Sequence, residues 1–156
     1  MFEEIKYAGT FRVELRDEFG NLKDLREGKN LVTNDGKAWL IAHAFDSGVT
    51  SIGFISIGSS VSATALITDS GTSTGLTRAD KTGIVYGSGA SAGYASGSAT
   101  FSTAIADTKT GITHACLWAR GSNNTASGVL FARQFFASVD KTGQDTLSVT
   151  WNVQFS

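Results

Sequence analysis

The stretch Asp145-Thr-Leu-Ser-Val-Thr-Trp-Asn-Val-Gln-Phe155 alternates strictly between polar and apolar residues. Successive side chains of a β-strand point to opposite faces, so this period of two predicts a strand with one apolar face. That face is expected to close a β-sheet core and carries Leu147, Val149, Trp151, Val153 and Phe155. The other face suits either solvent or a flat polar contact with another protein. Its residues are all uncharged: Thr146, Ser148, Thr150, Asn152 and Gln154.

Further strand patterns precede this one and are separated by turn residues rather than by helical crossovers. They are predicted at residues 51–58, 81–86, 98–105, 111–120 and 129–139. Residues 58–77 are expected to form a long surface loop, and 87–97 a second one rich in Gly, Ser and Ala. Seven or eight short antiparallel strands predict an all-β fold, specifically a β-sandwich resembling a jelly roll.

One short helix is predicted over residues 37–45, in the N-terminal half of the chain. Thr33 or Asn34 can cap it, and Asp35 lies in the first turn, where the helix dipole favours an anion. The helix presents apolar residues at helical spacing on one side, namely Ala38, Ile41, Ala42 and Phe45. His43, near its C-terminal end, is interpreted as a helix-end or surface residue.

The N-terminal segment differs chemically from the rest, because 13 of the 27 charged residues lie in the first thirty positions. Apolar Phe11, Val13 and Leu15 alternate there with charged residues, and 18–21 resembles a turn into a second strand at 22–26. Residues 1–30 are therefore predicted to form a charged hairpin. It is either an edge of the sheet protected by its charges or an arm that reaches a partner.

Length, composition and charge limit the classes of protein to which the chain can belong. The 156 residues predict a single domain, and one cysteine excludes an internal disulfide. The chain starts without a basic, then apolar, secretion signal and lacks a long apolar stretch, so we expect no export by that route and no membrane span.

A net charge of −1 predicts no general attraction to nucleic acid or anionic lipid. Gly, Ser and Thr make up 54 of the 156 residues, which is common in proteins that pack side by side in assemblies.

The sequence offers weak signals for chemistry. Gly87-Ser-Gly-Ala-Ser-Ala-Gly93 superficially resembles a dinucleotide fingerprint, but a strand pattern follows it instead of a helix. His114 and Cys116 share one face of a predicted strand with Ile112 and Trp118, which favours core packing over metal binding. The two histidines lie outside any recognisable nucleophile setting. We therefore expect no catalytic residue, cofactor or metal, and a protein that is not an enzyme.

Several short motifs, in this order, resemble a loose family of small virion proteins of tailed bacteriophages. They are Lys29-Asn-Leu-Val-Thr-Asn-Asp-Gly36, Ile55-Ser-Ile-Gly-Ser59, Ile112-Thr-His-Ala-Cys-Leu-Trp118, Leu130-Phe-Ala-Arg-Gln-Phe135 and Lys141-Thr-Gly-Gln-Asp-Thr-Leu-Ser-Val-Thr-Trp151. Family members more often carry glutamate and glycine at positions 114 and 116, so no role tied to that glutamate is transferred. The resemblance implies a non-enzymatic β-sandwich that assembles on a phage particle.

The first functional expectation is a capsid decoration or cement protein, made in the host cytoplasm and bound to the capsid exterior. Its expected partners are the major capsid protein and neighbouring copies of itself in a homo-oligomer. Candidate contact residues lie in the charged N-terminal segment: Phe2, Ile5 and Tyr7 as apolar anchors, Arg12 and Arg16 as orienting charges. The alternatives are a tail or fibre component, or a carbohydrate- or receptor-binding module that uses Tyr86, Tyr94 and the 87–97 segment.

Overall fold

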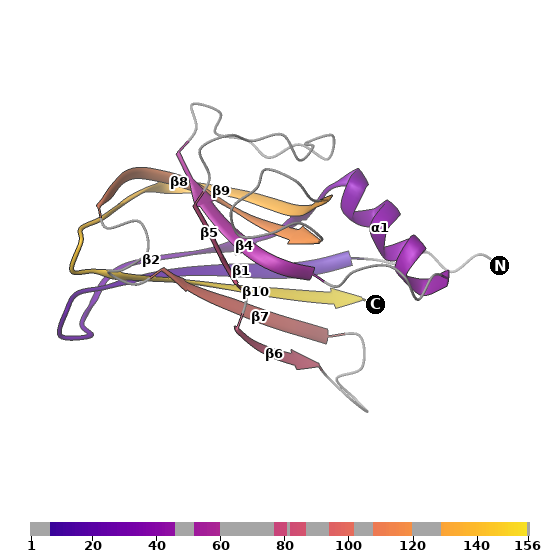
Figure 1. Ribbon diagram of the computed structural model, residues 1–156, viewed down its shortest axis with the longest axis horizontal. Coiled ribbons are helices and arrows are strands. Elements are labelled where there is room, and N and C mark those ends of the chain that lie inside the picture. Colours follow the sequence, from indigo (N-terminus) through magenta and orange to yellow (C-terminus); the bar gives the residue numbers. More distant parts are fainter. Residues whose placement is uncertain are drawn as a thin grey trace.

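The computed structural model describes residues 7–45, 52–59, 77–80, 82–86, 94–101, 108–119 and 129–155, which form two five-stranded antiparallel sheets and one helix (Figure 1). Sheet 1 has the order β2 (Leu22–Lys29), β1 (Tyr7–Arg16), β10 (Thr146–Phe155), β7 (Tyr94–Phe101), β6 (Thr82–Tyr86). Sheet 2 has the order β3 (Leu31–Val32), β9 (Val129–Lys141), β8 (Lys109–Ala119), β4 (Ile52–Gly58), β5 (Thr77–Asp80). The prediction of an all-β antiparallel sandwich with one short helix is confirmed.

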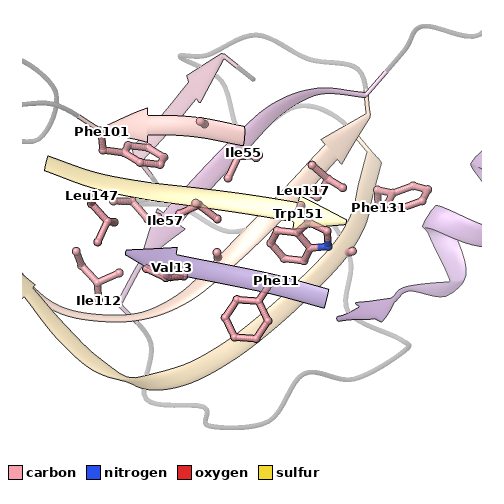
Figure 2. Packing of buried hydrophobic residues seen from close by; sticks show 14 of the residues in the cluster. Phe11, Val13, Ile55, Ile57, Phe101, Ile112, Leu117, Phe131, Leu147 and Trp151 are labelled. Atoms are coloured by element: carbon pink, nitrogen blue, oxygen red, sulfur yellow. The ribbon is translucent and has the colours of Figure 1, made fainter. Parts of the chain in front are cut away.

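The core lies between the two sheets, where the predicted alternation places it. Along β10, Leu147, Val149, Trp151 and Val153 are buried, and the residues between them are not. Figure 2 shows side chains of β1 and β10 directed toward those of β4 and β8. The largest buried members of this cluster include Phe11, Phe101, Phe131 and Trp151. A central position for β10 in sheet 1 follows from its ten-residue pairing with β1 and its pairing with β7.

The charged hairpin is present as β1 and β2, joined by a turn at residues 17–21. The structure places β2 at an edge of sheet 1, which agrees with the interpretation of its charges as protection of an edge. Arg26 of this edge strand also donates from Nε to the carbonyl oxygen of Ala137 on β9, at 3.3 Å. The edge is therefore tied across to sheet 2.

The helix α1 (Asn34–Phe45) begins earlier than predicted, and Thr33 is its cap, with Oγ1 accepting from the Gly36 amide at 3.1 Å. The longest apolar stripe of the helix would be expected to face the core, but the helix packs on the core with its opposite side. Trp39 is buried against Phe131 of β9, with ring centroids 5.7 Å apart. The side with Ala38, Ile41, Ala42 and Phe45 faces outward. Figure 1 shows α1 at one end of the sandwich and the β1–β2 turn at the other.

The strands differ from the prediction in one boundary and in two short strands that were not predicted. Residues 94–97 were assigned to the glycine-rich segment, but they form the start of β7, because their backbones pair with β10 and Gly97 lies opposite Trp151. The short strands β3 and β5 were not predicted, since two to four residues show too little alternation to be recognised. Of the loop expected over residues 58–77, Gly58 ends β4 and Thr77 begins β5, and residues 60–76 lie outside the described residues.

A buried carboxylate ties the β1–β2 hairpin to the turn before β10. Asp145 is 2% exposed, and its two oxygens accept from Lys23 Nζ at 2.9 and 2.8 Å. The Thr142 amide donates to the same carboxylate at 2.8 Å. Burial raises the pKa of Asp145, but the hydrogen bonds from Lys23 and Thr142 outweigh burial and lower it below its ordinary value of 3.8. This group therefore stabilises the fold in its charged form.

We expect Asp145→Asn to lower the free energy of unfolding at neutral pH by about 2 kcal/mol, the range for hydrogen bonds to a charged group. A lowered folded-state pKa gives stability that is present above the unfolded-state pKa and is lost as pH falls through the folded-state pKa. The difference between the variant and the wild type should therefore shrink in urea titrations carried out below pH 3.8. Glu18→Gln, at an exposed turn position, is the matched control. A difference that is independent of pH would contradict this assignment.

Candidate interaction surface

The outer side of sheet 1, called the open face below, consists of side chains on β1, β10 and β7 that point away from sheet 2. The outward residues of β10 are half-buried or exposed and continue in register onto β7. Ser148 lies opposite Thr100, and Thr150 lies opposite Ser98. Every outward residue of β10 is a small or medium uncharged polar residue, as the sequence predicted. The sheet therefore presents a continuous polar ladder across two strands.

Hydrogen bonds across the strands order this ladder. The Thr100 and Ser148 hydroxyl oxygens lie 3.4 Å apart, and Asn152 Nδ2 donates to Thr10 Oγ1 at 3.0 Å. Cross-strand pairs of this kind stabilise sheets, and short side chains have little rotamer entropy left to lose. A partner that covers the open face would therefore meet side chains that are already ordered.

The β1 side of the open face carries a compact cluster of charges. Glu14 accepts hydrogen bonds from Arg12 Nε at 2.6 Å and from Arg16 Nε and Nη2 at 3.2 and 3.0 Å. Arg12 also reaches Glu27 of β2 at 3.1 Å. The hydrogen bond from Arg16 is the main reason why the pKa of Glu14 lies below its ordinary value. Exposed ion pairs of this kind add little stability, so their main effect is to hold both arginines in fixed directions.

The tip of the β1–β2 hairpin exposes two apolar side chains. Phe19 is 82% exposed and Leu22 is 48% exposed. The turn that carries Phe19 is ordered by Asp17, whose Oδ1 accepts from the Phe19 and Asn21 amides at 2.9 and 2.8 Å. The hydrogen bond from the Asn21 side chain is the main cause that lowers the pKa of Asp17. A structured turn that presents Phe19 to solvent offers an apolar anchor beside the open face.

A groove of about 410 Å³ lies where β1, β10 and the end of β2 meet. Gly9 and Asn30 are in close contact in this groove. A Cβ atom at position 9 would lie 2.4 Å from the side-chain oxygen of Asn30. The other lining residues are Ala8, Thr10, Lys29, Asn152 and Gln154. Five of the seven lining residues have polar side chains and one of these, Lys29, is a cation, so the groove extends the open face toward the β2 edge.

The predicted contact residues are only partly brought together. Arg12 and Arg16 lie on the open face, where Glu14 bridges them. Tyr7 is the first residue of β1 and pairs with Phe155, so an arm separate from the sandwich can comprise only residues before Tyr7. Phe2 and Ile5 lie outside the described residues. The attachment role of these five residues stays a prediction.

The sequence did not single out Phe19 and Leu22 as exposed apolar residues. A signal for Phe19 was present, since a phenylalanine in a predicted turn has no strand face through which to reach the core. Leu22 was less visible, because the register of β1 and β2 shifts between Leu15 and Arg16. Such a shift changes which residues of β2 lie opposite those of β1, and sequence alternation cannot reveal it.

His114 and Cys116 are buried on the same strand as Trp118, which confirms that this group is packed in the interior, but Cys116 and Trp118 form a small cluster with Leu130 that is separate from the main core. His114 lies against the Phe135 ring, with centroids 5.2 Å apart, and Trp118 Nε1 donates to Ser56 Oγ at 2.7 Å. Ile112 was expected on the same face, and this was wrong. It belongs to the main core, because the pairing of β8 with β9 shifts register between Ile112 and His114.

Within the part of the chain that the structure describes, no group of three or more His, Cys, Asp or Glu residues lies close enough together to hold a metal ion. In that same part, no helix is long and apolar enough to cross a membrane. Tyr86 and Tyr94, which were considered for carbohydrate binding, lie on β6 and β7, and residues 87–93 between them lie outside the described ranges. No family model, curated protein or solved structure matches this chain.

Proposed function

We propose that the chain is a non-enzymatic structural protein of a tailed-phage virion, and that it attaches to the particle through the open face. The observation that carries the proposal is the uninterrupted uncharged polar ladder of β10 and β7. The charges of this face lie on the β1 side, so the β10 and β7 side is left uncharged. The family resemblance of the sequence motifs supports the virion as the setting.

The size of the open face fits a modest interface. Three strands at about 4.8 Å spacing, over the length of about 27 Å along which β10 pairs with β7, give a patch of about 390 Å². A standard protein interface covers about 800 Å² on each partner, so the patch supplies about half of that area. Phe19 and Leu22 at the hairpin tip extend the contact and provide apolar anchors. A protein present in many copies on a lattice needs only modest affinity at each site.

Within this proposal a capsid decoration or cement role comes first, with the major capsid protein and neighbouring copies as partners. Such a protein occurs in many copies over the shell, whereas a tail or fibre component occurs in few. The number of copies per particle, measured by gel densitometry of purified virions, separates the two roles. A low copy number would move the proposal to the tail.

A charge placed on the open face tests the attachment surface. We expect Thr150→Arg to weaken binding to particles that lack the protein by about 100-fold, because burying an uncompensated charge at an interface costs several kcal/mol. Co-sedimentation of the purified chain with such particles measures this. Thr110→Arg, at an exposed position on β8 in the other sheet, is the matched control and should bind as the wild type does.

The fold of both variants is checked by their urea unfolding curves. Equal binding by Thr150→Arg and the wild type, with both chains folded, would remove the open face from the proposal. Failure of the wild type itself to bind particles would remove the virion role, whichever face is considered.

A further inference from the structure

The helix α1 has apolar residues on two opposite sides. Gly36, Trp39 and Leu40 face β9 and the core. The opposite side carries a second set at helical spacing, called the α1 stripe, which comprises Ala38, Ile41, Ala42 and Phe45. At 100° per residue these four side chains fall within one sector about 100° wide. A helix that is apolar on both sides is typical of one covered on both sides.

The α1 stripe is open in the folded chain. Ile41 is 59% exposed and Phe45 is 89% exposed, while Ala38 and Ala42 are also exposed. Ile41 and Phe45 are four residues apart on one helix, so they form a contiguous apolar patch with the two alanines, and contiguous exposed patches mark interaction sites. The helix cannot turn this side inward, because Gly36 and Thr33 hold its first turn against the backbone of β9.

We propose that the α1 stripe docks against the α1 stripe of a second copy of the chain, with the two helices antiparallel about a two-fold axis. In this arrangement Ala38 of each copy faces Phe45 of the other, and Ile41 faces Ala42. Each large side chain then meets a small one, so two bulky side chains do not oppose each other. The same matches occur twice by symmetry, as a two-fold interface requires.

The charges of the helix favour this antiparallel arrangement. Asp35 and Lys37 near its start and His43 near its end lie off the stripe, so the contact itself is uncharged. Antiparallel pairing places the positive N-terminal end of each helix beside the negative C-terminal end of the other. A parallel pair would instead oppose Phe45 to Phe45 and Ala38 to Ala38, and would align like ends of the dipoles.

The contact is small. A helix of 12 residues is about 18 Å long and about 10 Å wide with its side chains. This footprint lies well below the area of a stable dimer interface, so the pairing should be weak and concentration-dependent in solution. Repetition on a lattice would strengthen it. The α1 stripe lies apart from the open face, and the pairing can fail without affecting the proposed attachment.

Sedimentation velocity of the full chain over a range of concentrations tests the pairing. The wild type should shift from monomer to dimer as concentration rises, and Ile41→Asp should raise the dissociation constant at least about 100-fold, because a buried carboxylate would face Ala42. Thr110→Asp, at an exposed position on β8 outside both proposed surfaces, is the matched control and should dimerise like the wild type. A wild type that stays monomeric throughout overturns the proposal and assigns the stripe to a different partner.

Disulfide trapping tests the antiparallel arrangement. Cys116 is buried, so cysteines introduced at the surface dominate the reaction. A mixture of Ala38→Cys and Phe45→Cys chains should form a disulfide-linked dimer under mild oxidation. Ala38→Cys alone should not, because seven residues of helix separate its two copies by about 10 Å. Efficient crosslinking of Ala38→Cys with itself, and none in the mixture, would overturn the antiparallel pairing.

Discussion

Replacing Trp151 with alanine is expected to lower the free energy of unfolding by about 4 kcal/mol, the usual cost of removing a buried Trp side chain. Trp151 is 1% exposed on the central strand β10, with its ring centroid 6.2 Å from that of Phe11. On the neighbouring strand it lies opposite Gly97, which has no side chain to refill the space. The cavity should therefore persist. Thermal unfolding should show a midpoint lowered by about 10 °C.

The matched control for Trp151→Ala is another aromatic-to-alanine change at a site where nothing is buried. Phe45 is 89% exposed, so Phe45→Ala should change the stability of the monomeric chain by less than about 0.5 kcal/mol. The measurements are made at low protein concentration, so that the proposed pairing of two α1 stripes does not contribute to the stability. Similar losses for the two variants would mean that the core is not organised around β10.

Gly36→Ala is expected to have the second-largest effect, a loss of about 3 kcal/mol, at the upper end of the usual cost of overpacking. A Cβ atom at position 36 would lie 2.2 Å from the carbonyl oxygen of Phe131, which belongs to the backbone of β9 and cannot rotate away. The helix must then lift from the strand. Lifting would break the 3.0 Å hydrogen bond from the Thr33 amide to the same oxygen and withdraw Trp39 from Phe131. Urea unfolding followed by tryptophan fluorescence measures both consequences.

Whether Gly36→Ala lowers or raises the free energy of unfolding distinguishes two effects, overpacking against β9 and helix propensity. Helix propensity alone would make Gly36→Ala stabilising by about 1 kcal/mol. A stabilised variant would therefore contradict the close contact between α1 and β9. Gly20→Ala is the matched control, since Gly20 has open space around it and a φ of 83°. It should lose only about 1 kcal/mol, the cost of the left-handed backbone for a residue with a Cβ atom.

The sheets could be predicted from the sequence because their strands are long and half-buried. In β10 and in residues 11–16 of β1 each apolar residue is separated from the next by a polar one, so the period of two is visible without any knowledge of the partner strand. The helix was found from its cap and composition, but its orientation was not predictable from apolar spacing. Its outward stripe is the longer apolar pattern, whereas its inward side depends on Gly36, which signals close backbone approach only once β9 is in place.

The candidate surface was predictable in part. The uncharged outer residues of β10 were visible as one face of a strand. Their continuation onto β7 was not, because it depends on which strands become neighbours in the sheet. The bridge between Arg12 and Arg16 through Glu14 follows from alternation on β1, but the additional pair with Glu27 requires the hairpin register. Sequence patterns describe single strands well and the pairing of distant strands poorly.

A reconstruction of the intact phage particle by electron microscopy tests the central claim most directly. The account predicts density for this sandwich distributed over the icosahedral shell, with the open face of β1, β10 and β7 against the major capsid protein and the charged cluster at its border. Density confined to the tail would contradict the decoration role. Shell density with the open face turned toward solvent would contradict the attachment surface.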